Sequence, residues 1–120
     1  MEILKVVCQL IIGVGILNVW LVRFNESSRY RGGSAKNMKE EFAAYGLPEK
    51  LVWIVGSVKI AGAIALLAGI AFPRLIAPAA ALLAVLMLAA VLLHVKVQDP
   101  LYKSVPAATV FLLLIFLLVF

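Results

Sequence analysis

Four long apolar blocks divide the chain, and their length constrains the fold more than any other feature. The blocks are Ile3–Phe24, Pro48–Ala71, Leu75–Val95 and Pro100–Phe120. A helix needs about 20 apolar residues to cross a bilayer core of about 30 Å, and each block meets that length once its ends tilt or fray. Hydrophobic residues make up 65% of the chain, well above the roughly 45–50% of soluble domains. The sequence therefore predicts an all-α membrane protein, a bundle of four transmembrane helices in a single membrane domain of residues 1–120.

The fourth block reaches this length only if it begins at Pro100. Counted from Pro106 it has 15 residues, about 22 Å of helix, which is too short for a core of about 30 Å. A start at Pro100 makes Asp99 the N-cap and gives the proline the first helical position, where a missing N–H is harmless. Pro106 then lies about two turns into the helix and is expected to bend it. The first block is expected to be retained, because no small-residue cleavage site follows it.

The sizeable polar segment of the chain, Asn25–Leu47, separates the first two blocks. Its basic run Arg29–Ser34 is expected to be flexible. Farther along, Met38, Phe42 and Tyr45 follow the i, i+4, i+7 spacing of an amphipathic helix, and the Gly-Leu-Pro sequence after them is a helix stop. This pattern predicts a short helix lying at the membrane interface. A solvated helix packed over the mouth of the bundle is the alternative.

Basic residues predict the orientation of the chain in the membrane. Eight of them flank or lie in the first and third loops, whereas Lys5 and Arg74 belong to the opposite side. Because cytoplasmic loops are enriched in Lys and Arg, loops one and three are predicted to be cytoplasmic, with both termini on the other side. The eight residues are Arg23, Arg29, Arg31, Lys36, Lys39, Lys50, Lys96 and Lys103.

Five polar side chains near the loop-one end of the helices make up the candidate site. They are Asn18, Arg23, Lys59, His94 and Asp99. Asn18 and Arg23 end the first block, Lys59 lies about three turns into the second, His94 ends the third, and Asp99 precedes the fourth. All five belong to one leaflet, and we predict that they form a mainly cationic pocket.

Lys59 is the member of this set whose position is most unusual. It lies some 13–16 Å below the start of its helix at roughly 1.5 Å per residue, where facing lipid would cost on the order of 2.5–3.5 kcal/mol. It should therefore face the bundle, as an ion-pair partner of Asp99, as a ligand or partner contact, or by snorkelling. His94 has a structural alternative as a favourable charge at a helix C-terminus, and Asn18 has one as a hydrogen-bond donor to a neighbouring helix.

Other residue types restrict the chemistry that this chain can carry out. The single cysteine, Cys8, has no partner for a dithiol mechanism, and one histidine with few carboxylates does not make a metal site. No catalytic residue is assigned. Loop one is basic, but it lies beside membrane phosphates, so nucleic acid is not an expected partner. The first three blocks hold no interior carboxylate for proton-coupled cation export, so a ligand would be anionic or carbonyl-bearing.

Three short stretches resemble a known family. The run His-Val-Lys-Val-Gln-Asp-Pro-Leu at 94–101 resembles the DoxX-like family, in particular the branch that includes the vertebrate nicotinic acetylcholine receptor chaperone. The run Gly-Ser-Val-Lys-Ile-Ala-Gly at 56–62, and the stretch that ends in Gly-Leu-Pro at 46–48, are also similar to it. Lys59 departs from the family pattern, which has an acidic residue there. His94 and Asp99 match, and the resemblance implies that both belong to the family's polar cluster.

The resemblance implies a four-helix membrane protein without established catalytic machinery. Members are linked to the assembly of other membrane proteins, or to redox complexes such as thiosulfate:quinone oxidoreductase. We therefore expect a non-enzymatic protein that associates with other membrane proteins, and a homo-oligomer is compatible with this. The alternative is a redox subunit that binds a quinone or an anionic lipid, with His94 and Lys59 placed to hydrogen-bond quinone carbonyls. A quinone site requires an apolar cleft beside His94, whereas an assembly factor requires a closed pocket and an exposed helix seam.

Overall fold

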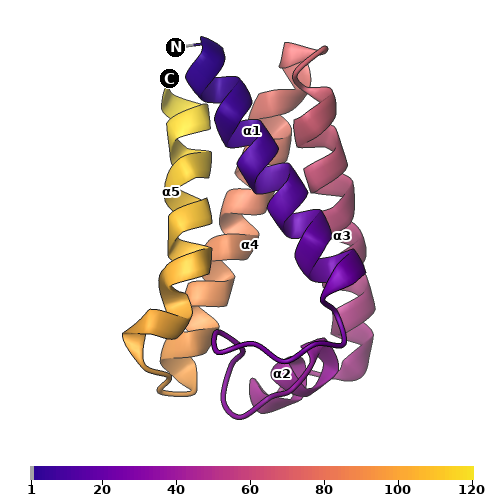
Figure 1. Cartoon of the computed structure of the whole chain (residues 1–120), viewed down its shortest axis with the longest axis vertical. Coiled ribbons are helices and arrows are strands. Elements are labelled where there is room, and N and C mark those ends of the chain that lie inside the picture. Colours follow the sequence, from indigo (N-terminus) through magenta and orange to yellow (C-terminus); the bar gives the residue numbers. More distant parts are fainter. Residues whose placement is uncertain (1) are drawn as a thin grey trace.

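The computed structural model describes residues 2–120, and these form helices joined by loops (Figure 1). The helices in chain order are α1 (Glu2–Leu17), the π-helical turn η1 (Asn18–Val22), α2 (Met38–Ala44), α3 (Glu49–Ala68), the 3₁₀ turn η2 (Pro73–Leu75), α4 (Ile76–Lys96), the 3₁₀ turn η3 (Leu101–Ser104) and α5 (Val105–Val119).

Four helical segments are long and apolar enough to cross a membrane, which confirms the predicted fold class. They are Glu2–Val22, Glu49–Ala68, Pro73–Lys96 and Leu101–Val119. Both termini lie at one end of the bundle, and α2 lies with its loop at the other end (Figure 1). The chain therefore has its sizeable polar segment on one side of the four helices.

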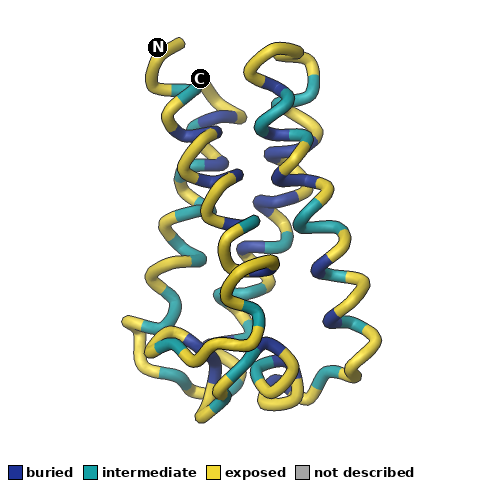
Figure 2. Tube along the Cα trace, turned by 45° about the vertical axis from the view of Figure 1, so that its right-hand side comes forward, coloured by how far each residue is buried: buried dark blue, intermediate teal, exposed yellow. Residues whose placement is uncertain are grey.

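The four long helices pack as a ring in which α1 contacts α3 and α5, and α4 contacts the same two helices. Each helix contributes one large side chain that is fully buried at the centre: Ile12, Leu66, Leu83 and Leu114 are all 0% exposed. Buried positions recur along each helix between exposed ones (Figure 2). Because many of the exposed side chains are also apolar, the outer surface suits contact with lipid rather than water.

The short helix α2 forms where the amphipathic spacing predicted it. Its N-cap is Asn37, whose side-chain oxygen accepts a hydrogen bond from the amide of Glu40 at 2.9 Å. Such a cap satisfies one of the N–H groups that a helix start leaves free. Met38 and Phe42 are buried against the bundle core, and Gly46 ends the segment with a φ of +79°. The apolar side of α2 thus packs onto the bundle.

The start of the fourth spanning segment differs from the prediction. Pro100 is extended, with a ψ of 150°, and it precedes the η3 turn. The α-helical part begins only at Val105, so Pro106 lies in its first turn and does not bend it from within. Asp99 is not an N-cap, because no side-chain cap bond is made there. Its carboxylate contacts Gly33 of loop one and His94 of α4 instead. The local sequence pattern could not reveal the contact with Gly33.

The π-helical turn η1 continues α1 at the loop-one end, and this turn brings Trp20 against α3. The amide of Arg23 donates to the carbonyl of Asn18 at 2.9 Å, and this hydrogen bond joins residues five positions apart, as in a π-helix. Trp20 is only 7% exposed and lies on Gly56, where an added Cβ would come within 2.6 Å of the indole ring. Glycine is therefore required at position 56 by close packing between the two helices.

Gly56→Leu should lower the free energy of unfolding by about 2 kcal/mol, because the side chain has to displace a rigid, buried indole. The measurement is an SDS titration of the purified protein in mixed micelles. Ser57→Leu is the matched control, since Ser57 is the next residue and is exposed. Equal stability of the two variants would contradict the packing argument.

Candidate functional site

His94 and Asp99, which the sequence predicted to share a polar cluster, are in direct contact. The Nδ1 atom of His94 lies 2.7 Å from Oδ2 of Asp99, and the two side chains are 7% and 5% exposed. The turn between them is tight: the amide of Asp99 donates to the carbonyl of His94 at 3.0 Å, and Gln98 has a φ of +58°. The end of α4 thus holds a buried imidazole and carboxylate pair.

The carboxylate of Asp99 also binds the tip of loop one. The amide of Gly33 donates to Oδ1 at 3.0 Å, and Gly33 has a φ of +57°. Lys103 lies 3.7 Å from the same oxygen and donates to the Gly33 carbonyl at 2.6 Å. Burial acts to raise the pKa of Asp99, but the hydrogen bonds from His94 and Gly33 and the nearby Lys103 outweigh it and hold that pKa below its usual value. Asp99 is therefore a carboxylate that joins loops one and three.

Tyr45 lies on the other side of the imidazole. Its hydroxyl is 3.4 Å from Nε2 of His94, and the two rings meet edge to face. Because Asp99 accepts from Nδ1, a neutral His94 carries its proton there, and Nε2 then accepts from the hydroxyl. Burial, and then the nearby carboxylates of Glu41 and Asp99, raise the pKa of Tyr45 above its usual value, so the phenol remains a donor.

We call this set of contacts the loop clasp. Its residues are Gly33, Tyr45, His94, Lys96, Asp99 and Lys103, and Lys96 joins it by donating to the Tyr45 carbonyl at 3.1 Å. The clasp connects loop one and the end of α2 with the end of α4 and η3. Both imidazole nitrogens already have partners within it. As it stands the histidine is engaged in holding two loops together and does not face open space.

Arg31 organises loop one from the inside and is 7% exposed. It donates to the carbonyls of Arg23 at 2.7 Å, Phe24 at 3.3 Å and Glu26 at 3.1 Å, and it lies 3.7 Å from Glu41 of α2. These carbonyls follow the end of η1, where helical partners run out. Within the run Arg29–Ser34, which was expected to be flexible, Arg31 is therefore buried and bound to backbone carbonyls of residues that precede the run.

Lys59 lies on the core-facing side of α3 but makes no contact with Asp99. Its ammonium is 5.7 Å from the centre of the Trp20 ring, within the range of a cation–π contact. Among residues 2–120, the cationic side chains within ion-pair distance of Asp99 are His94 and Lys103. The ion pair between Lys59 and Asp99, one of the three alternatives given for Lys59, is therefore not formed. The Lys59 ammonium lies over the aromatic ring of Trp20 instead.

The other two predicted site residues lie apart from the loop clasp. Asn18 begins η1 and is exposed. The side chain of Arg23 is 46% exposed and lies 3.9 Å from Glu26. The structure thus brings two of the five predicted residues into contact and leaves the other three apart from them, at the start of η1, just after η1 and in α3. A ligand role for these five residues stays a prediction.

Six residues that form these contacts were not among the predicted site residues: Arg31, Gly32, Gly33, Tyr45, Lys96 and Lys103. The two consecutive glycines were the available signal. At Gly32 an added Cβ would come within 2.5 Å of the Tyr45 ring, and Gly33 has a left-handed backbone that glycine adopts without strain. A glycine pair inside a basic loop can therefore indicate close packing as well as flexibility.

The fold and the site define a class of protein: a small multi-pass integral membrane protein whose polar loops are bound to one another at one end of the bundle. Residues 27–118 match the DoxX-like family, and the chain belongs to that family. No curated protein and no solved structure matches the chain. The family match spans both loops of the clasp.

Proposed function

We propose that this protein acts non-enzymatically in the assembly or stabilisation of other membrane proteins. The observation that carries the proposal is the small number of buried residues in α5. Two of its side chains, Leu114 and Leu117, are buried in the bundle. By comparison, α3 buries five residues and α4 buries six. The uncharged outer face of α5 includes Leu112, which is 65% exposed, and so offers a seam on which another membrane helix can pack.

The loop clasp supports the same proposal by fixing the ends of the helices. A helix seam binds a partner well when its own geometry is set beforehand, because less freedom is lost on binding. Membership of the DoxX-like family is compatible with an assembly role. The resemblance of the 94–101 run to the nicotinic acetylcholine receptor chaperone adds to it, and placement in that branch is part of the proposal.

Quinone binding, the alternative, has less support from the geometry. It calls for an apolar cleft that opens to lipid beside His94, yet His94 is 6% exposed and lies between Tyr45 and Asp99. Both of its ring nitrogens are engaged, so a quinone carbonyl would have to displace a protein partner. We therefore rank the assembly role first.

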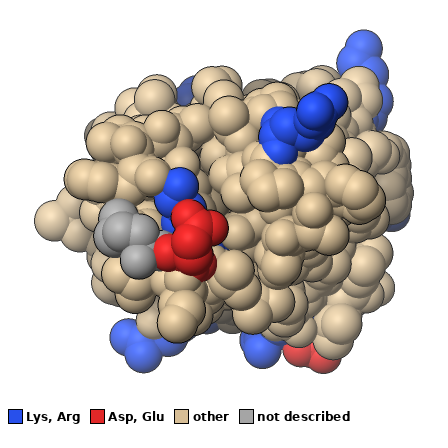
Figure 3. Space-filling view, turned by 90° about the horizontal axis from the view of Figure 1, so that it is seen from above, with Lys and Arg blue, Asp and Glu red and all other residues tan. Residues whose placement is uncertain are grey.

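We also propose that loops one and three are cytoplasmic. The opposite end, where the termini lie, presents a mostly uncharged surface (Figure 3), and the basic residues predicted for that side are Lys5 and Arg74. The excess of Lys and Arg on the loop-one side supports this orientation through the positive-inside rule.

Photo-crosslinking in native membranes tests the assembly role. A benzophenone amino acid at position 112 should crosslink to defined membrane proteins, and the amounts of those same proteins should fall when the gene for this chain is deleted. The same probe at Ile64, which is exposed on α3, is the matched control. Crosslinks to lipid alone, together with unchanged protein amounts, would refute the role. A quinone that co-purifies in stoichiometric amount and is lost in His94→Ala would instead favour the alternative.

A further inference from the structure

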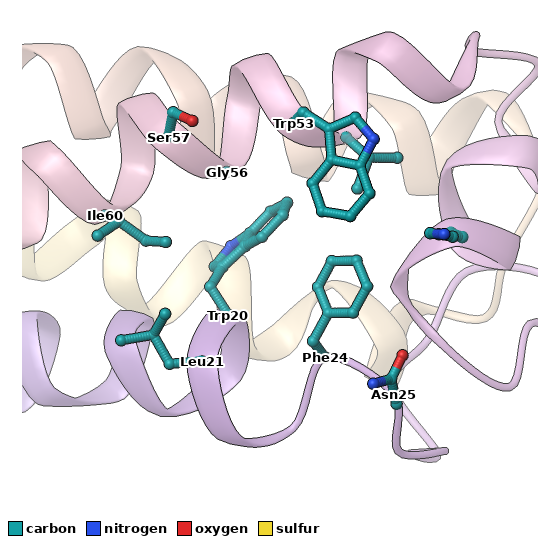
Figure 4. A pocket seen from close by; sticks show the side chains of 10 residues that line it. Trp20, Leu21, Phe24, Asn25, Trp53, Gly56, Ser57 and Ile60 are labelled. Carbon is teal, nitrogen blue, oxygen red and sulfur yellow. The ribbon is translucent and has the colours of Figure 1, made fainter.

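A groove of about 440 Å³ runs along the outside of the bundle between η1 and α3. Its floor is made by Trp20, Val52 and Gly56, and Figure 4 shows Trp20 pointing into its centre. The floor of the groove forms because η1 turns the indole toward α3, where Gly56 has no side chain to keep the ring away from the helix. It is distinct from the loop clasp and shares no residue with it.

The two ends of the groove differ in polarity. Toward loop one, Phe24 and Trp53 stack with ring centres 5.7 Å apart, and Asn25 and Lys39 lie beside them. Toward the middle of the membrane, the lining is Leu21, Ser57 and Ile60. Such an order, with aromatic and charged groups at the interface and, apart from Ser57, aliphatic groups deeper, follows the order of headgroup and acyl chain in a bilayer.

Lys39 gives the interfacial end its charge. Within residues 2–120, Lys39 is the charged residue of the lining, and no acidic residue lines the groove. Its ammonium lies 5.3 Å from the centre of the Trp53 ring and 3.3 Å from a carboxylate oxygen of Glu49, in a pair whose side chains are 50% and 65% exposed. Because an exposed ion pair contributes little stability, a phosphate can replace Glu49 as the partner of Lys39 at small cost.

We propose that this groove binds an anionic glycerophospholipid from the surrounding bilayer. The phosphate lies against Lys39 and Asn25, the glycerol region lies beside the stacked rings of Phe24 and Trp53, and an acyl chain lies over Trp20 between Leu21 and Ile60. The proposal does not depend on the assembly role. An assembly factor and a redox subunit would both be stabilised by a lipid held across the seam between η1 and α3.

Tryptophan fluorescence reports directly on this site, since the chain has two tryptophans and both line the groove. The protein is reconstituted into phosphatidylcholine vesicles that contain increasing fractions of phosphatidylglycerol with brominated chains. A parallel series uses brominated phosphatidylcholine. We expect brominated phosphatidylglycerol to quench as if enriched at the groove by about fivefold, the preference that one lysine near the surface gives an anionic lipid.

Two pairs of variants separate this site from general charge attraction. Lys39→Gln should abolish the preference, whereas Lys36→Gln should retain it, because Lys36 lies in the same loop but does not line the groove. Ser57→Phe should reduce quenching by both lipids through filling the deep end. Ile64→Phe is its control, on an exposed part of the same helix. The two lysine variants are compared between the two lipids, which cancels any direct effect on emission, and quenching in the two phenylalanine variants is expressed relative to each variant's own emission in vesicles without bromine.

Equal quenching by the two brominated lipids in the wild type would overturn the proposal, because the groove would then be ordinary lipid contact. A preference that survives Lys39→Gln would overturn it as well, since the charge that attracts the lipid would lie elsewhere. The substituted side chains are exposed or partly exposed, and circular dichroism verifies that each variant remains helical.

Discussion

Arg31→Met should lower the free energy of unfolding by about 4 kcal/mol, the range found when one partner of a buried charge network is removed. The guanidinium binds three backbone carbonyls and lies 3.7 Å from Glu41. Without it these carbonyls lose their donors, and a largely buried carboxylate loses its cation. An SDS titration in mixed micelles measures the change, and hydrogen exchange should show that residues 24–38 lose protection before the helices do.

Arg29→Met is the control for this change. Arg29 lies two residues away and is exposed, and its guanidinium lies over the rings of Tyr30 and Tyr102 at 5.5 and 5.4 Å. Exposed cation–π contacts are worth about 0.5–1 kcal/mol, so this variant should stay close to the wild type. If the two arginine variants were equally stable, Arg31 would not be the organiser of loop one.

Asp99→Ala should destabilise the protein by about 3 kcal/mol, because it leaves the buried imidazole of His94 and the amide of Gly33 without their acceptor. The variant should also detach loop one from loop three, since the carboxylate contacts both Gly33 and His94. Limited proteolysis within loop one, compared between wild type and variant, measures this detachment. A loop that stays protected in Asp99→Ala would show that the clasp does not hold it.

The pH dependence of the same contact provides a further check with Asp99→Asn. The pKa of Asp99 is held below its ordinary value of 3.8, so the folded state binds the proton less readily than the unfolded state does. The contribution of the carboxylate is therefore complete above about pH 4 and is lost as the pH falls through the lower, folded-state pKa. The stabilities of wild type and Asp99→Asn should converge at the acidic end of the titration.

The sequence was sufficient for the spanning segments because their signal is local and large. About twenty apolar residues in succession have no stable place except a membrane or a large core, and the spacing of Met38, Phe42 and Tyr45 likewise reports which side of α2 is buried. It failed at the start of the fourth segment. Asp99, directly before Pro100, satisfies the local rule for an N-cap. Its carboxylate instead accepts from Gly33 and contacts His94.

The candidate site was predictable only in part for the same reason. The contact between His94 and Asp99 spans five residues, so a motif in the sequence can contain both. The contacts from Asp99 to Gly33 and from His94 to Tyr45 span 66 and 49 residues, and no local pattern encodes them. An ion pair with Asp99 was one of three alternatives for Lys59, but the ammonium lies instead over the indole of Trp20.

The sequence by itself determined that this chain crosses a membrane with four helices, because the transfer of apolar side chains out of water depends on composition and run length. Only the tertiary structure decided what each polar side chain binds. Hydrogen bonds and ion pairs are short and directional, so the partners of Arg31 and Asp99 depend on how loops far apart in the sequence fold onto one another. The groove beside Trp20 is likewise a product of packing, since it needs a π-helical turn on one helix and a glycine on another.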